Sequence, residues 1–163
     1  MKIPVAVADT GPLHYLALID RTDILQHLFG TILVPGAVRA ELLHPNSPSQ
    51  AKSFINTPFT WLQFAQVQHP SNLSTIVQRG EAETIAIEKG AQSVLIDDSQ
   101  GRKLAHEFGL SALGTVGILE IAAGRNLIDL PTALEALRKT NIFIAESILV
   151  AALQRDESRR ARR

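Results

Sequence analysis

Short apolar runs alternate along the chain with segments whose apolar residues recur at helical spacing. The runs at 3–8, 31–34 and 93–96 are nearly continuous, which is typical of strands buried on both faces of a sheet. Two weaker runs, at 61–64 and 111–113, predict further strands, and the first of them is a candidate edge strand.

Helices are predicted between these strands, because prolines open and glycines close the segments with helical spacing. The predicted helices lie at about 12–28 (with a break at 20–22), 35–43, 51–55, 80–89, 104–108, 118–123, 133–139 and 144–153. Strands that alternate with helices favour a parallel sheet covered by helices. We therefore predict one α/β domain over residues 1–154, with a mostly parallel sheet of four or five strands, and a basic tail at 155–163.

Composition narrows the class of protein. The 163 residues suffice for one domain with a real core, and 45% of them are hydrophobic. The sequence has no cysteine, which excludes disulfides and thiolate metal sites and fits a reducing cytoplasm. No apolar run approaches the roughly 18 residues of a membrane span, and the N-terminal run ends early, at Asp9, so we expect a strand there and no signal peptide or membrane partner.

Charge is balanced overall but uneven along the chain. The formal net charge is zero, which argues against a uniformly basic nucleic-acid binder. However, five arginines fall within the last nine residues. This tail is interpreted either as a solvated, frayed terminus, which is the favoured interpretation, or as an arm that attracts phosphates.

Acidic residues mark the ends of two predicted strands. Asp9 follows the first, and Asp97 and Asp98 follow the run at 93–96. Sites in parallel sheets form beyond the carboxyl ends of the strands, so these acids converge if the two strands are neighbours. On a helical wheel Glu41 falls on the apolar face of its helix, between Ala37 and Val38, and we expect it to face inward.

The helix at 80–89 offers two more acids, Glu81 and Glu83. They lie about 200° apart on the wheel, so we expect only one of them to face a shared site, and the wheel does not choose between them. Each acid also has a simpler explanation, as a helix cap, an ion-pair partner or a complement to a helix dipole.

Because carboxylates that meet repel one another, a shared site would require a divalent cation, and hard oxygen ligands select Mg²⁺ or Mn²⁺. Such ions support hydrolysis of phosphodiesters.

Five segments carry a resemblance. In order they are VADTGPL at 7–13, VPGAVRAEL at 34–42, GEAETIA at 80–86, LIDDSQGRKLA at 95–105 and GTVGIL at 114–119. Together they resemble the motifs of an uncharacterised, DUF3368-type subfamily of PIN domains related to VapC-like toxins. The resemblance implies a three-layer α/β/α sandwich, a metal-dependent endoribonuclease with an RNA substrate, a homodimer and an antitoxin protein as partner.

The resemblance also assigns roles to residues. It makes Asp9 the first acid, Glu41 the second, Glu81 the third and Asp98 or Asp97 the last, all as metal ligands. Typical PIN domains carry an Asp within a helix at the third position, whereas here a Gly-Glu pair is expected to open one. We expect a second group of residues around these acids or against the substrate: Thr10, Ser99, Arg102 and Thr115.

Other functions fit the sequence less well. The Asp-Thr-Gly at 9–11 also occurs in aspartic proteases, but there it lies in a β-rich context, and here a helix follows. The five histidines lack zinc-ligand spacing. A catalytically inactive PIN-like module that binds RNA or protein remains the alternative, with the apolar faces at 133–139 and 144–153 either completing the core or contacting a partner.

Overall fold

The computed structural model describes residues 4–67 and 77–163, so the polar connection predicted at 68–73 lies outside the described residues. Within them, five strands form one sheet in the order β3-β2-β1-β4-β5, and every pairing is parallel. The strands are β1 (Val5–Ala8), β2 (Thr31–Pro35), β3 (Leu62–Ala65), β4 (Ser93–Leu95) and β5 (Ser111–Leu113). The predicted fold class is confirmed, and β3 lies at an edge as expected.

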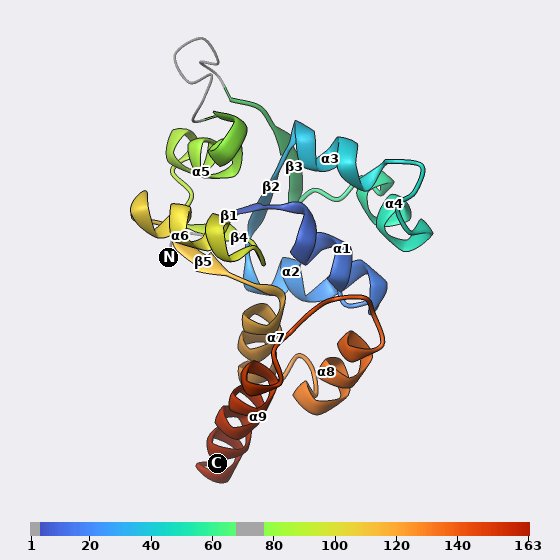
Figure 1. Cartoon of the computed structure of the whole chain (residues 1–163), viewed down its shortest axis with the longest axis vertical. Helices are drawn as coiled ribbons and strands as arrows, with labels where there is room; N and C mark the ends of the chain where they lie inside the picture. The colour runs from blue at the N-terminus through green and yellow to red at the C-terminus, as the bar shows by residue number, and fades with distance from the viewer. Residues whose placement is uncertain (1–3, 68–76) are drawn as a thin grey trace.

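Helices cover both faces of the sheet (Figure 1). They are α1 (Thr10–Leu18), α2 (Asp23–Leu28), α3 (Gly36–Leu42), α4 (Ser49–Asn56), α5 (Val77–Lys89), α6 (Ser99–Glu107), α7 (Thr115–Gly124), α8 (Leu130–Arg138) and α9 (Glu146–Ala161). Because side chains alternate along a strand, Ala6, Ala8 and Ile32 join the core formed with α1, α2 and α7, whereas Val7 and Leu33 pack under α5 and α6.

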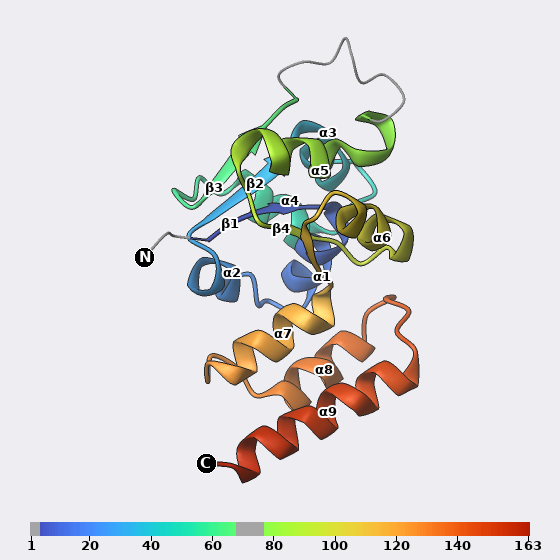
Figure 2. The ribbon, with the colours of Figure 1, turned by 90° about the vertical axis from the view of Figure 1, so that its left-hand side faces the viewer.

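The last three helices form a layer of their own beyond the sheet (Figure 2). Leu134 and Leu137 of α8 and Leu149 and Ala152 of α9 are buried in the same core as α7. These apolar faces therefore complete the core. None of the helices in the described ranges is long and apolar enough to cross a bilayer.

Two helix boundaries differ from the prediction. Helix α5 begins at Val77, so Gly80 and Glu81 lie inside the helix and do not open it. Helix α9 extends to Ala161, which overturns the interpretation of the basic tail as frayed. The sequence pattern ended near Leu153 because the later turns of α9 are held by charged side chains, not by a continued apolar stripe.

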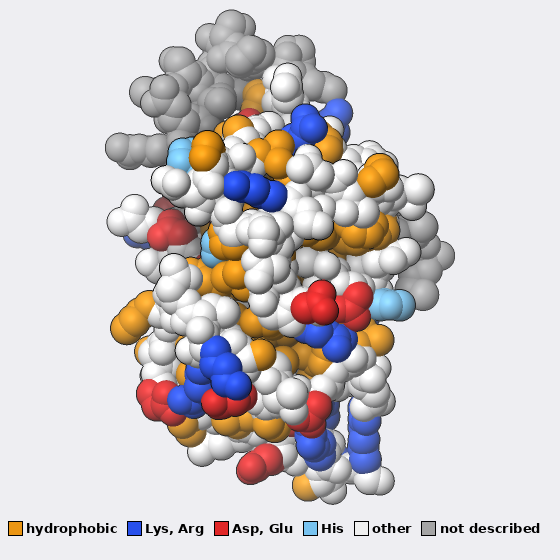
Figure 3. All heavy atoms as spheres, turned by 90° about the vertical axis from the view of Figure 1, so that its right-hand side faces the viewer, with side chains coloured by type: hydrophobic (Ala, Val, Ile, Leu, Met, Phe, Trp, Pro, Cys, Tyr) orange, Lys and Arg blue, Asp and Glu red, His pale blue; other side chains and the backbone are white. Residues whose placement is uncertain are grey.

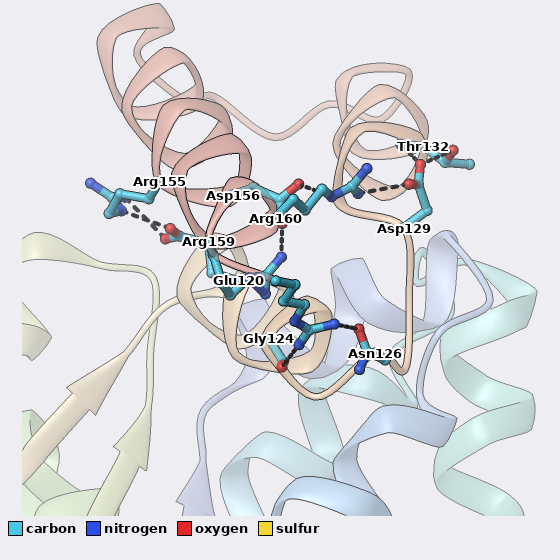
Figure 4. Close-up of polar contacts among 10 residues, drawn as sticks. Glu120, Gly124, Asn126, Asp129, Thr132, Arg155, Asp156, Arg159 and Arg160 are labelled. Carbon is cyan, nitrogen blue, oxygen red and sulfur yellow. Dashed lines mark hydrogen bonds and ion pairs between the residues drawn. The ribbon is translucent and has the colours of Figure 1, made fainter.

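Those charged side chains alternate in sign. On the face shown in Figure 3, basic and acidic groups adjoin one another at the lower end, where α8 and α9 lie. Figure 4 shows the bonds: Arg155 of α9 donates to both carboxylate oxygens of Glu120 on α7, at 2.8 and 3.1 Å. Arg160 bonds to Asp156 at 2.9 Å and to Asp129 at 2.8 Å. We call these residues, with Arg159 on Asp156, the arginine network.

Candidate active site

The sheet order brings the predicted acids together. Strands β1 and β4 are neighbours, with Ala8 opposite Leu95, and the Asp9 N–H donates to the Leu95 carbonyl at 2.8 Å. Asp9 and the Asp97-Asp98 pair therefore follow adjacent strands, which meets the condition under which these acids were expected to converge. Helix α3, which follows the neighbouring strand β2, delivers Glu41, and α5 crosses the same region with Glu81 and Glu83.

An open cleft of about 800 Å³ lies between α3, α5 and α6 at the carboxyl ends of the strands. Its lining includes acidic side chains from all three helices and from the ends of β1 and β4. These are Asp9, Glu41, Glu81, Glu83, Asp98 and Glu107. Five of these six acids were considered from the sequence, and Glu107 was not.

Asp9 is the acid of the cleft whose pKa is affected by the largest number of other carboxylates. Burial raises its pKa first of all, a hydrogen bond at Thr10 opposes this, and the charges of Glu41, Asp98 and Asp97 raise it further. Three separate carboxylates thus act on one, which is the electrostatic signature of a shared site.

Glu41 lines the open cleft and is exposed, whereas it was predicted to face inward. The wheel placed it on a buried face, and this is wrong, because the side chain is exposed. Ala37, on the same side of α3, is exposed too, so that side opens into the cleft and does not face the core. The Thr10 hydroxyl donates to the Glu41 Oε2 atom at 2.7 Å, so Thr10 orients Glu41.

The structure distinguishes Glu81 from Glu83, which the wheel did not. Glu83 is only 2% exposed, and its Oε1 has no hydrogen-bond partner among the described residues. Burial raises its pKa, and the charge of Asp9 raises it further. Glu81 also lines the cleft, and burial alone raises its pKa. Glu83 is therefore the acid of α5 that is coupled to Asp9.

The adjacent Asp97 and Asp98 have separate surroundings. Asp98 lines the cleft and caps α6, accepting from the Gly101 N–H at 2.8 Å. Asp97 lies behind it and accepts from both the Thr115 N–H, at 2.6 Å, and the Thr115 hydroxyl, at 2.7 Å. A Cβ at Gly114 would come within 2.9 Å of the Asp97 Oδ1, so the glycine makes room for this carboxylate.

Helix α6 contributes residues that the sequence analysis missed. Gln100, Lys103, Leu104 and Glu107 line the cleft, whereas Ser99 and Arg102, which were expected near the acids, are not part of its lining. The missed residues follow i, i+3, i+4, i+7 spacing, so they share one face of the helix, and that signal is present in the sequence.

The donor set suits a hard cation. Carboxylate oxygens are the ligands that Mg²⁺ and Mn²⁺ take in proteins, and the unpartnered, buried Glu83 Oε1 is a polar atom that a cation would satisfy. In the described ranges, however, no three His, Asp or Glu side chains lie close enough to hold an ion. The acids stand apart because uncompensated carboxylates repel one another. In addition, hydrogen bonds from the Thr10 hydroxyl and the Gly101 N–H hold Glu41 and Asp98 in place.

Fold and cleft together define an α/β protein whose acidic site lies at the topological switch point, where the strand order reverses between β1 and β4. The model of one family, DUF3368, described as a PIN domain, matches residues 5–158. Since that match covers 154 of the 163 residues, the chain belongs to this family of PIN domains. PIN domains are generally nucleases and typically use divalent metals. No curated protein matches the chain.

Proposed function

We propose that this PIN domain is an endoribonuclease that depends on Mg²⁺ or Mn²⁺. Asp9, Glu41, Glu83 and Asp98 are the residues that would draw together around the metal, since no three of them lie within reach of one ion in this structure. The observation that carries the proposal is the convergence of Asp9, Glu41, Glu83 and Asp98 on one cleft. There the charges of Glu41, Asp98 and Asp97 raise the pKa of Asp9, and the charge of Asp9 raises that of Glu83. Carboxylates gathered in this way destabilise a fold unless a cation or a proton compensates them.

The chain's own residues position these acids. Thr10 fixes one oxygen of Glu41, and the Gly101 N–H fixes one oxygen of Asp98. Thr115 binds both oxygens of Asp97, which leaves Asp97 to act on Asp9 through its charge and not as a free ligand. When bound, the divalent cation supplies an activated water and stabilises charge on the phosphodiester. Glu81, the third acid expected from the motif, lines the cleft but is not one of the proposed metal ligands.

The biological setting is part of the same proposal. The resemblance to VapC-like toxins supports a cytoplasmic toxin that acts on RNA, forms a homodimer and is neutralised by an antitoxin protein. These parts rest on the family resemblance, whereas the metal-dependent chemistry also rests on the cleft.

One observation favours a second function. Because no three acids of the described residues lie within reach of one ion, the cleft also fits a catalytically inactive PIN-like module that binds RNA or protein. Such a module would tolerate acids that never assemble around a cation.

Cleavage of a mixed RNA pool separates the two functions. We expect wild-type protein to cleave with Mn²⁺ and not with chelator, and Asp98→Asn to lose at least about 100-fold in rate, the scale on which one preorganised charge-stabilising group acts. Asn caps a helix about as well as Asp, so this change removes charge and keeps the α6 cap. Asp129→Asn is the matched control. Asp129 caps α8 in the same way as Asp98 caps α6, but it does not line the cleft.

Equal cleavage in chelator, or an undiminished rate in Asp98→Asn, would contradict the nuclease proposal. RNA binding without cleavage by the wild type would support the inactive module.

A further inference from the structure

Among the described side chains, the cleft has one positive charge, and it has no described partner. Among the described residues that line it, Lys103 of α6 is the only cation, beside six carboxylic acids. Lys103 is exposed, and no ion pair or hydrogen bond joins its ammonium to any described residue. The residues whose side chains are not described, 1–3 and 68–80, include no Asp or Glu that would pair with it.

Among the described residues Lys103 is unpaired, although acidic residues line the same cleft. Glu107 lies four residues further along the same face of α6, at the spacing of a helical ion pair, yet the two side chains do not meet within 4.0 Å. Lys N-terminal to Glu is the weaker order for such a pair. The arginines of the arginine network, in contrast, each bond to an acid.

An acid-lined cleft repels a polyanion. A cation at the metal ligands offsets the charge around Asp9, but Glu81 and Glu107 still face an incoming RNA backbone. Lys103 lies five residues from Asp98, so their backbone positions are about 7.5 Å apart along the helix axis at 1.5 Å per residue, and both residues line the cleft. A lysine ammonium is a point charge that suits a phosphate.

We infer that Lys103 binds a phosphate of a single-stranded RNA substrate, next to the phosphate that is cleaved. This inference rests on the proposed function and adds the residue through which the acidic cleft accepts a nucleic-acid backbone. Lys103 is a substrate-binding residue in this account and takes no part in holding the metal.

The test uses a labelled single-stranded RNA bound to full-length Asp98→Asn protein, which is expected not to cleave it, over a series of salt concentrations. Adding Lys103→Gln is expected to weaken binding roughly tenfold, the scale of one charge-assisted hydrogen bond. It is also expected to lower the slope of log affinity against log salt by about 0.7, the value for one phosphate contact on a single strand. Lys103→Arg should restore both values, and Lys139→Gln, which removes an exposed lysine at the end of α8, should change neither.

Two further measurements in the Asp98-containing protein distinguish this inference from the nuclease proposal. In Lys103→Gln, KM for RNA cleavage should rise while kcat and the Mn²⁺-induced increase in melting temperature stay as in wild type. If Lys103→Gln binds RNA with the affinity and salt slope of Lys139→Gln, the inference is wrong even where wild type cleaves RNA. If Lys103→Gln weakens binding but wild type never cleaves, the phosphate contact stands and the nuclease proposal fails. Absence of any RNA binding overturns both.

Discussion

The cleft and the arginine network use the same kinds of side chain in opposite ways. In the cleft, Asp9, Glu81 and Glu83 have raised pKa values, mainly because they are buried there. In the arginine network, hydrogen bonds from Thr132 and Arg160 lower the pKa of Asp129 to about 2. Ionised acids therefore cost stability at one end of the molecule and contribute it at the other.

This difference separates function from architecture. The acids of the arginine network fasten α9 to α7 and to the start of α8, so they are explained by the fold alone. Within the described residues, no cationic side chain forms an ion pair with an acid of the cleft, and Glu83 retains an oxygen with no partner. An arrangement that costs stability and is not needed for packing points to a ligand.

The largest expected effect distinguishes the two acids of α5. Glu83→Gln should reduce Mn²⁺-dependent RNA cleavage by at least about 100-fold, because it removes the buried carboxylate that is coupled to Asp9. Glu81→Gln, two residues away in the same cleft, is the matched control and should retain most of the rate. Rate measurements on both variants under one condition decide the point. A larger loss in Glu81→Gln would instead restore the assignment that the Gly-Glu motif suggests.

The next effect concerns the centre of the arginine network. The side chain of Asp156 is 3% exposed and bonds to Arg159 and Arg160, so Asp156→Ala should lower the free energy of unfolding by about 2 kcal/mol. Its two partners are partly exposed and turn to solvent when the acid is lost, which keeps the cost below that of two fully buried ions. Urea unfolding measures the change, and Glu157→Ala, an exposed acid on the same helix, should leave stability within about 0.5 kcal/mol. A fall in stability as large in Glu157→Ala would show that helix charge, and not the network, is responsible.

The smallest effect is expected at an ion pair outside both regions. Arg138 bonds to Glu146 at 2.9 Å, but the two side chains are 41% and 67% exposed. Solvent screens such a pair, so Arg138→Gln should change the free energy of unfolding by less than about 0.5 kcal/mol. If urea unfolding showed that Arg138→Gln loses as much stability as Asp156→Ala, then burial of Asp156 would not explain why the arginine network stabilises the fold.

The sequence predicts most of this fold because its strands are short, apolar and separated by clear helix signals. The position of Asp9 and Asp98 followed from the same pattern, since parallel strands end at one edge of the sheet. The inward face expected for Glu41 was wrong because a helical wheel cannot tell a core from an open cleft.

Three features depend on contacts between distant segments and were beyond the pattern. Glu81 and Glu83 could not be separated, because burial of Glu83 depends on how α5 lies across β1. Thr115 was expected among the residues around the acids, but its particular partner, Asp97, lies 18 positions away and could not be named from the pattern. The end of α9 is fixed by ion pairs to α7 and to Asp129, so no local hydrophobic period marks it.

The central claim is that the cleft holds its acids at an electrostatic cost that a divalent cation relieves. Thermal melting of Asp9→Asn beside wild type tests it most directly. Because the pKa of Asp9 is raised in the folded protein, its ionised form destabilises the fold at pH 7, and this cost disappears as the pH falls toward the ordinary value of 3.8, where the group becomes protonated.

Without metal, Asp9→Asn is therefore predicted to melt above wild type at pH 7, with the difference shrinking as the pH is lowered to about 4. Addition of Mn²⁺ at pH 7 should raise the melting temperature of wild type and leave that of Asp9→Asn nearly unchanged. A variant that melts below wild type at pH 7 without metal, or that gains as much from Mn²⁺ as wild type does, would contradict the account.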